Sequence, residues 1–456
     1  NTAQKVGFRE RAESLFNWSP DPEFEPKLPE EVMLLPAAGD PLHLIVGLIS
    51  DSGRCGPLND LLTDLAELRD DAGLSGPDVL ILENGSATPG ETCILDVTQR
   101  WREQNLRVHL ISCVERDAAS QGGELPTIAA HGQRWAISQA RTALQTYLYH
   151  FAVKRPGSVV WIVDDDMRLD PLIDTSGRKQ RTRLPLANRL SQLKTQGVDI
   201  AIGPYTGAPP LPVLSTVRVQ MVDLLASLRW IECLGQTQPL PDRRADNRRL
   251  REGRRDYYYD LSHGETDRLE SAFLLEPATT GETVAHALSR LTGQLGRLLS
   301  GEQIFRPLSV AAAEVNAFIS KESLHRGGNT FVFNIETLVD APNAVPDIDG
   351  RPTRRSDMMW ALLQRHQFNR RVVSVPLPTY HAREALKTSS DEDERCLADD
   401  IRGFAVFTAM RDYLAEPDID LGSRAEKYRE ERLAAFRLAV YRVRGLAREL
   451  QVLAER

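Results

Sequence analysis

Runs of consecutive apolar residues in the first half of the chain have the length of buried β-strands. They cover residues 42–49, 79–82, 108–112, 159–163 and 198–203. Between these runs, residues 58–68, 94–104, 131–153 and 187–195 have the pattern of helices. Strands that are apolar on both faces and that alternate with helices predict an α/β fold. We therefore expect a mostly parallel, doubly wound sheet.

The alternation stops in the middle of the chain and returns later. Residues 206–305 contain helical patterns without clear strands, so we interpret them as a helical insertion. Inside it, an Arg-rich stretch at 243–255 also carries acidic residues and precedes three tyrosines at 257–259. Both a solvated surface segment and a mobile lid over a binding site fit this composition. Alternation resumes over residues 306–385, with strands at 331–333 and 372–375 around a helix at 358–367.

The two ends of the chain differ from this core. Residues 1–40 are rich in Pro and Glu and predict an extended arm, whereas residues 386–456 predict helices. In the latter, Ser423 and Glu426 have the spacing of a capping box. An apolar seam follows, made of Leu433, Phe436, Val440, Val443, Ala447 and Leu450. The seam fits packing on the body of the protein and also homo-oligomerisation.

The predicted domain order follows from these boundaries. It is an arm at 1–40, one half of the α/β domain at 41–205, the helical insertion at 206–305, the other half at 306–385 and C-terminal helices at 386–456.

Composition and charge restrict the class of protein. The chain is 41% hydrophobic and 26% charged, which is typical of a globular protein, and its net charge of −8 argues against a general nucleic-acid binder. No apolar run reaches the roughly 18–20 residues that span a membrane, and the N-terminal residues show no secretory signal. The five cysteines are scattered, with no Cys-x-x-Cys pair. This predicts neither a zinc framework nor a disulfide scaffold and favours a reducing cytoplasm.

Three consecutive aspartates, Asp164, Asp165 and Asp166, directly follow the apolar run at 159–163. Their charges repel one another at the mouth of a buried strand, and a bound cation would relieve that repulsion. Ligands of open α/β sheets bind beyond the carboxyl ends of the strands, where these residues fall. Carboxylate oxygens there suit Mg²⁺ or Mn²⁺ bridging a diphosphate. The alternative is a solvated acidic turn.

Over about residues 42–385 the chain resembles the GT-A glycosyltransferases, in particular the large family 2 group. The turn Glu83-Asn84-Gly85-Ser86 resembles the acidic turn after the family's second strand. The stretch from Gly132 to Arg141 resembles the helix entered before the metal-binding strand. The aspartate triplet itself resembles the Asp-x-Asp metal motif.

Two further segments of this chain match the family's acceptor side. Arg326-Gly327-Gly328 resembles the glycine turn, and Arg355-Ser356-Asp357 stands where the family has its x-Glu-Asp motif. Two departures are present. Ser356 replaces the acid that usually precedes the aspartate, and the turn after the first strand is altered to Ser50-Asp51-Ser52-Gly53.

The resemblance implies a role for individual residues. Asp51 and Glu83 would lie near the nucleoside, and Arg141, Asp165 and Arg383 near the rest of the donor. Asp164, Asp166 and His381 would bind the metal, and Gly327, Gly328 and Trp360 would face the acceptor. Asp357 would be the catalytic base. The implied partners are a UDP- or GDP-sugar donor and a hydroxyl acceptor, with Mn²⁺ or Mg²⁺ as cofactor.

Two of these roles have structural alternatives. Ser356 and Asp357 precede a helical pattern, so Asp357 could cap a helix instead of, or as well as, accepting a proton. His381 follows the last predicted strand, and a lone histidine is often structural rather than a ligand.

The sequence therefore predicts a metal-dependent, inverting glycosyltransferase that does not bind nucleic acid. Two other functions remain open. One is a sugar nucleotidyltransferase, for which Gly53-Arg54-Cys55-Gly56 is only a faint phosphate-loop signal. The other is a non-catalytic module that binds nucleotide-sugars or glycans. The sequence leaves open the sugar, the nucleobase, the acceptor and contact with a membrane surface.

Overall fold

The computed structural model describes residues 41–454 except 72, 86–92, 124, 126–133, 176–177, 209–226, 243–276, 294–307, 323–327, 342, 344–346, 349–350, 353 and 383–389. The predicted arm at 1–40, the Arg-rich stretch and the three tyrosines lie outside the described residues, as does most of the predicted insertion. The described parts of that insertion are helical at 227–232 and in α9 (Val284–Gly293).

A large mixed sheet forms the centre of the described chain, and its strand order is β11-β15-β8-β12-β4-β1-β2-β3. These strands are β1 (Leu44–Ser50), β2 (Asp78–Glu83), β3 (Arg107–Ile111), β4 (Val159–Val163), β8 (Ile200–Ile202), β11 (Lys321–Glu322), β12 (Asn329–Val332) and β15 (Val372–Ser374). β1 pairs in parallel with β2 and β4, and β2 with β3. β12 is antiparallel to both β4 and β8, and β15 is parallel to β8. The predicted α/β fold with a mostly parallel sheet is confirmed.

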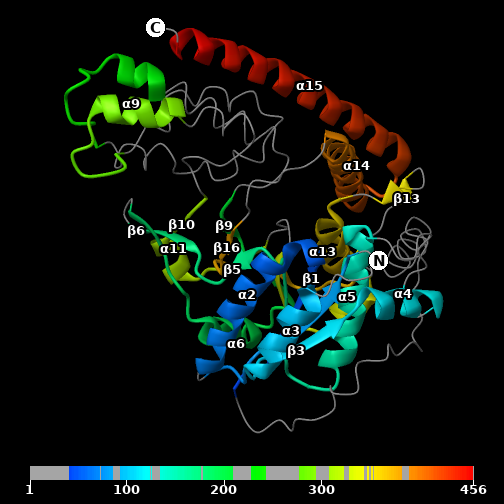
Figure 1. The fold of residues 1–456 in the computed structure, drawn as a ribbon. Coiled ribbons are helices and arrows are strands. Elements are labelled where there is room, and N and C mark those ends of the chain that lie inside the picture. Colours follow the sequence, from blue (N-terminus) through cyan, green and yellow to red (C-terminus); the bar gives the residue numbers. More distant parts are fainter. Residues whose placement is uncertain are drawn as a thin grey trace.

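Helices cover both faces of this sheet (Figure 1). On one face lie α4 (Cys113–Gln121), α5 (Ile137–Ala152), α13 (Ser356–Gln367) and α14 (Ser390–Ala415). On the other lie α2 (Cys55–Glu67), α3 (Cys93–Glu103) and α6 (Leu186–Thr195). Successive residues of each strand point to opposite faces, so every central strand supplies apolar side chains to both cores. This is why the strands appear in the sequence as unbroken apolar runs.

The interior of β4 shows how tightly the sheet is packed. Val159, Val160 and Trp161 are almost fully buried. The Trp161 ring stacks on Phe331 of the neighbouring β12, with 5.0 Å between ring centroids, and its indole N–H donates to Asn329. The buried indole is thus satisfied within the sheet. The strand therefore ends on a rigid platform, and the acidic triplet begins at its edge.

The sheet changes direction between β1 and β4. The chain proceeds outward from β1 through β2 to β3 on one side, and from β4 on the other side. Helices that leave neighbouring strands toward opposite faces open a crevice at such a switch point, beyond the carboxyl ends of the two strands. Ser50 ends β1 there, and Asp164 follows β4.

A small three-stranded sheet crosses this edge. It consists of β5 (Met167–Arg168), β9 (Tyr205–Gly207) and β16 (Thr379–His381), in the order β5-β16-β9. His381 pairs with Met167, so the ladder brings residue 381 beside the acidic triplet.

The remaining described strands are β6 (Leu172–Thr175), β7 (Arg178–Arg181), β10 (Val310–Ala311), β13 (Asp347–Ile348) and β14 (Arg351–Pro352). The remaining named helices are η2 (Ser52–Arg54), η3 (Leu68–Asp70), α11 (Ala312–Ala317), α12 (Thr337–Asp340) and α15 (Leu421–Ala454).

The two C-terminal helices, α14 and α15, pack against each other and form what we call the C-terminal hairpin (Figure 1). Phe436 of the predicted seam is buried with Ile401, whereas Val440 is 36% exposed. The seam thus packs on the protein in its first part. The predicted capping box is wrong, because α15 begins at Leu421 and the Asp420 carboxylate accepts from the Ser423 N–H. Among the helices that the structure describes, none has both the length and the apolarity to traverse a bilayer.

A buried charge cluster lies at the opposite, amino end of the sheet. Asp78, the first residue of β2, is 1% exposed and contacts His43 at 2.7 Å and Arg107 at 3.2 Å. His109 and Arg155 lie slightly farther away, each at 3.7 Å. Burial alone would raise the pKa of Asp78, but hydrogen bonds from the two histidines and the charges of the two arginines hold it well below its usual range.

We expect Asp78→Asn to lower the free energy of unfolding at pH 7 by about 3 kcal/mol, because it leaves buried cations without their counter-charge. The depressed pKa means that the native state favours the ionised form. This contribution is complete above the unfolded pKa of about 4 and is lost as the pH falls below it. In urea unfolding, the difference between wild type and variant should therefore shrink at acid pH. Asp60→Asn, at a side chain 59% exposed, is the control and should change stability little. Equal stability of Asp78→Asn and wild type at pH 7 would contradict the prediction.

Candidate functional site

A cavity of about 290 Å³ opens at the switch point between β1 and β4. Five acidic side chains and five arginines line it, together with several polar and apolar residues. The charged residues are Asp51, Arg54, Arg134, Arg141, Asp164, Asp165, Asp166, Arg354, Arg355 and Asp357; the others used below are Ser50, Asn84, Tyr205, Ala208, Ser356 and His381. Of the residues that the sequence analysis assigned to the site, seven line this cavity although they lie far apart in the sequence: Asp51, Arg141, Asp164, Asp165, Asp166, Asp357 and His381.

The middle aspartate of the triplet turns inward. Asp165 is 4% exposed, accepts a hydrogen bond from Ser50 Oγ at 2.7 Å, and forms an ion pair with Arg54 in which Nη2 lies 2.6 Å from Oδ1. Burial raises the pKa of Asp165 to about 6, against the opposing effect of Arg54 and Ser50. Asp165 therefore joins the ends of β1 and β4 and fixes Arg54, rather than facing the cavity as a free carboxylate.

Asp166 lies between two cationic or proton-donating groups. Its Oδ2 is 2.9 Å from Arg54 Nη2 and 3.3 Å from His381 Nε2. Burial would raise its pKa, but His381 and Arg54 outweigh burial and hold the pKa of Asp166 well below its usual range. Asp166 is therefore an ionised carboxylate at neutral pH.

The ring of His381 is oriented by the small sheet that carries it. Its Nδ1 lies 3.3 Å from the Ala208 carbonyl oxygen, and the Ala382 N–H donates to the Asp166 carbonyl at 2.9 Å. When Nδ1 carries the proton that this carbonyl accepts, Nε2 presents a lone pair to the Asp166 carboxylate. Two acceptors that face each other in this way repel, and a proton or a metal cation between them removes the repulsion.

The geometry of this pair fits two ligands of one divalent ion. Adjacent ligands about 2.1 Å from an octahedral ion lie about 3.0 Å apart, close to the 3.3 Å between Asp166 Oδ2 and His381 Nε2. In the described part of the chain, no group of three or more His, Cys, Asp or Glu side chains is arranged to hold a metal. A divalent ion that also binds a diphosphate needs only one or two protein ligands, so Asp166 and His381 fit this kind of site.

The first aspartate of the triplet faces a different partner. Asp164 is the most exposed of the three, with 41% of its side chain accessible, and its Oδ1 accepts from Arg141 Nη2 at 3.1 Å. The other terminal nitrogen of Arg141, Nη1, lies 3.3 Å from Asp357 Oδ2. One guanidinium on α5 therefore joins the acid after β4 to the acid at the start of α13.

Asp357 does not cap α13. The helix begins at Ser356, so the N-cap position belongs to Arg355, whose side chain makes no cap hydrogen bond. The Asp357 carboxylate instead points to Arg141 and lines the cavity. Its place in the first helical turn still puts it in the favourable field of the helix dipole. The cap alternative is thus wrong for this residue, and the proton-accepting role stays a prediction.

Gly328 allows the backbone of β12 to approach Asp164. The Asp164 N–H donates to the Gly328 carbonyl at 3.1 Å. A β-carbon at residue 328 would collide with the Tyr205 hydroxyl and with the Asp164 carboxylate. Gly328 thus allows Asp164 and Tyr205 to lie against the start of β12. Gly327, like Arg383, lies outside the described residues.

The β1–β2 side of the cavity is polar. Asp51 accepts from the Gly53 N–H at 3.0 Å, which fixes the turn after β1, and pairs with Arg134 at 3.2 Å. Asn84 bonds both the N–H and the carbonyl of Trp135 and so holds the segment before α5. Glu83 does not line the cavity, because its carboxylate accepts from the Cys113 N–H at the start of α4.

Trp360, expected on the acceptor side, is a core residue. It is 3% exposed, and its indole N–H donates to the Thr337 carbonyl. It lies on α13 one turn after Asp357, and the helix directs it toward the sheet while Asp357 faces the cavity. The apolar contacts of the core therefore decide the position of Trp360.

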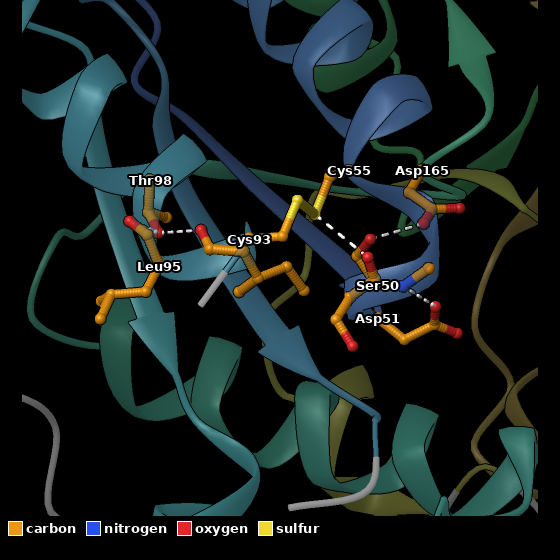
Figure 2. Close-up of a disulfide and its surroundings, with 10 residues drawn as sticks. Ser50, Asp51, Cys55, Cys93, Leu95, Thr98 and Asp165 are labelled. Atoms are coloured by element: carbon orange, nitrogen blue, oxygen red, sulfur yellow. Dashed lines mark hydrogen bonds between the residues drawn. A yellow bond between two sulfur atoms is a disulfide. The ribbon is translucent and has the colours of Figure 1, made fainter. Parts of the chain in front are cut away.

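The structure also contains a disulfide bond that the sequence did not predict. Cys55, the first residue of α2, is bonded to Cys93, the first residue of α3 (Figure 2). Figure 2 places it close to Ser50, Asp51 and Asp165 at the mouth of the site. The bond links the segments that follow β1 and β2, and it removes the cysteine-based argument for a reducing compartment.

Arg54 is the most important cavity residue to which the sequence analysis gave no role, although it named Arg54 within the faint phosphate-loop signal. It neutralises both buried aspartates of the triplet, and these ion pairs raise its pKa although burial alone would lower it. The available signal was its place in the turn after the first strand, at the same sheet edge as the triplet. Arg134 and Arg355 lie within segments that the resemblance had already matched, but neither was assigned a role, and Tyr205 carried no signal.

Comparison with known proteins gave distant structural similarities only. No family model and no curated protein matched the sequence. One similar solved structure is the mannosyltransferase PcManGT from Pyrobaculum calidifontis with GDP-Man and Mn²⁺, at 12% identity and a TM-score of 0.36, covering 100% of this chain and 84% of that one. Another is core-mannan synthase A from Aspergillus fumigatus in its Mn/GDP form, at 9% identity and a TM-score of 0.21, covering 59% of this chain and 76% of that one. A third is the mannosyltransferase Ktr4p from S. cerevisiae with GDP, at 9% identity and a TM-score of 0.21, covering 82% of this chain and 74% of that one. Similarities of this size do not decide what the chain does, so its function is inferred from its own residues.

We expect Gly328→Ala to lower stability by about 2 kcal/mol, because the added methyl group must displace Asp164, Tyr205 or the end of β12. Gly445→Ala is a matched control in α15, where an added methyl group meets open space and should be neutral or slightly stabilising. Thermal unfolding of the two variants beside the wild type measures the difference. An unfolding temperature of Gly328→Ala equal to that of Gly445→Ala would show that the close approach is not required.

Proposed function

We propose that this protein is a metal-dependent glycosyltransferase that moves a sugar from a nucleoside diphosphate sugar to a hydroxyl acceptor. The observation that carries the proposal is the pairing of Asp166 with His381 at 3.3 Å in a cavity that Asp357 also lines. Asp166 and His381 are suitable ligands for a cation that also binds a diphosphate, and Asp357 is a suitable proton acceptor for an acceptor hydroxyl. The position of the cavity at a sheet switch point agrees with nucleotide binding.

Asp166 and His381 would hold the metal, and the bound ion would neutralise the charge that develops on the departing nucleoside diphosphate. The residues around them keep this pair in place. Arg54 holds Asp165 against Ser50, so the backbone that carries Asp166 is anchored to β1. Arg54 also adds a positive charge beside Asp166, where the diphosphate would bind.

Asp357 is the proposed base. In an inverting transfer, a carboxylate accepts the proton of the acceptor hydroxyl as that oxygen attacks the anomeric carbon and the nucleoside diphosphate leaves. The oriented approach of the hydroxyl contributes as much as the proton transfer. Arg141 holds Asp357 and Asp164 on either side of its guanidinium, which fixes the base relative to the donor side of the cavity. Asp51 and Arg134, on the β1 side, would contact the nucleoside.

Two alternatives differ from this proposal in what they predict. A nucleotide-sugar-binding module without catalysis would bind the same donor and never release its nucleoside diphosphate. A sugar nucleotidyltransferase would need a nucleoside triphosphate and would release pyrophosphate. Ligand binding and product analysis therefore separate all three.

The donor site is tested by thermal unfolding with UDP, GDP and their sugars, each with and without Mn²⁺ or Mg²⁺. A ligand at 100 times its dissociation constant stabilises the protein by about 2.7 kcal/mol, which raises the unfolding temperature by some degrees. We expect the rise to need the metal and to be lost in Asp166→Ala and in His381→Ala. Asp60→Asn is the control, since Asp60 lies outside the cavity. A ligand-induced rise in unfolding temperature that occurs without the metal and persists in both variants would refute the proposed metal site.

The base is tested by Asp357→Asn, which keeps the shape of the side chain and removes its ability to accept a proton. Turnover of the donor that the binding experiment identifies should fall about 10²- to 10⁴-fold, whereas the metal-dependent thermal shift should persist. The two readouts are the release of nucleoside diphosphate and the unfolding temperature. Turnover within threefold of the wild type would exclude Asp357 as the base.

A further inference from the structure

The C-terminal hairpin contacts the segment that carries the proposed base. α14 lies between α13 and α15 (Figure 1). The backbone N–H of Arg354, which lines the cavity, lies within hydrogen-bonding distance of the Asp399 carbonyl, at 3.4 Å. Gly403, one turn farther along α14, touches the carbonyl of Arg354 so closely that a β-carbon at residue 403 would collide with it. The hairpin is therefore in backbone contact with the wall of the cavity.

Arg355 has an unusual backbone conformation. Its φ of 71° and ψ of 22° lie in the left-handed region, where a β-carbon is unfavourable. Such a residue keeps this conformation only when its surroundings hold it, and these conformations concentrate at functional sites. Arg355 is also the N-cap of α13, and its carbonyl accepts the first helical hydrogen bond, from the Met359 N–H at 3.1 Å. Its conformation therefore sets the direction in which α13 begins.

Asp400 of α14 holds the side chain of Arg355. It is 3% exposed, and its two carboxylate oxygens lie 3.2 and 3.4 Å from Arg355 Nη2. The Arg355 guanidinium also lies over the Phe404 ring, 5.3 Å from its centroid. From the other side, Arg432 of α15 approaches Asp400 at 3.8 Å and lies over the same ring at 4.4 Å. A buried carboxylate thus ties both helices of the hairpin to Arg355.

The contacts continue from Arg355 to the donor side of the cavity. Asp357 follows Arg355 by two residues and pairs with Arg141, which pairs with Asp164. A change in the start of α13 would move the Asp357 carboxylate relative to Arg141. Because proton transfer and attack depend on placement within fractions of an ångström, such a shift would lower turnover without removing any group that contacts the donor.

We propose that Asp400 is a positioning residue of the site, which keeps Arg355 in its left-handed conformation and thereby aims Asp357. The C-terminal hairpin is then a required part of the site rather than an appendage. The catalytic part of this inference rests on the proposed transferase function. The structural part, that Asp400 fixes the segment at 354–360, does not depend on it.

The first test compares Asp400→Asn with Asp412→Asn. Asp412 is a control on the same helix, because it also contacts α15, through the Tyr428 hydroxyl, but lies about three turns along α14 from Asp400. We expect Asp400→Asn to increase amide hydrogen exchange in the peptide over residues 354–360 and to lower kcat at least tenfold. The metal-dependent thermal shift by the nucleotide should be unchanged. Asp412→Asn should change neither exchange in that peptide nor kcat.

The second test uses the conformation of residue 355 itself. Arg355→Ala and Arg355→Gly both remove the guanidinium, but only glycine adopts the left-handed region without cost. We therefore expect Arg355→Gly to be several-fold more active than Arg355→Ala. In the double variant, Arg355→Gly should restore part of the activity that Asp400→Asn loses. A role of Asp400 in overall stability alone would not produce this rescue. If Asp400→Asn fails to fold, the comparison of Arg355→Ala with Arg355→Gly still tests whether the left-handed conformation of residue 355 is needed for activity.

Unchanged exchange at 354–360 in Asp400→Asn, or equal activity of Arg355→Ala and Arg355→Gly, would overturn the inference. If the wild type neither binds a nucleotide nor releases one, the proposed function fails. The exchange measurement would then still decide whether Asp400 fixes this segment, so the two failures are distinguishable.

Discussion

The repulsion among three consecutive carboxylates at the end of a buried strand is the constraint on which the rest of the site depends. Each aspartate is compensated by its own set of neighbours: Asp164 by Arg141, Asp165 by Arg54 and Ser50, and Asp166 by the same Arg54 and by His381. These partners come from α5, from the turn after β1 and from β16. The need to neutralise the triplet therefore joins the two halves of the sheet around one cavity, because unpaired charges at this depth would be costly.

The three aspartates of the triplet have different roles, which depend on the surroundings of each side chain. All three aspartates line the cavity, but Asp165 is held by Ser50 and Arg54 and so connects two strand ends. The same residue type thus serves as an internal anchor, as the partner of an arginine on α5 and as half of a candidate metal pair. The environment of each side chain, rather than its identity, decides these roles. The disulfide between Cys55 and Cys93 adds a covalent link beside this edge of the sheet.

Two walls of the cavity have different origins. The β1 and β4 edge supplies the acids and their counter-ions from elements that belong to the central sheet. The wall that carries Asp357 depends on α13, and the start of α13 is held by α14 through Arg355, Asp400 and the close contact at Gly403. A helical extension can therefore influence the proposed chemistry although none of its described residues lines the cavity.

The sequence by itself determined the central strands, several helices and the location of the acidic triplet. The apolar run at 159–163 coincides with β4, since a strand buried on both faces must be apolar at every position. Asp51, Asp164, Asp166, Asp357 and His381 were all expected at one site, and all line one cavity. Only the tertiary structure decided that Asp165 is an anchor, that Glu83 faces α4 and that Trp360 belongs to the core. It alone also revealed Arg54, the disulfide and the link from Asp400 to Arg355. The physical reason is that local spacing specifies which residues share a face of one strand or helix, whereas ion pairs and burial depend on which distant elements meet.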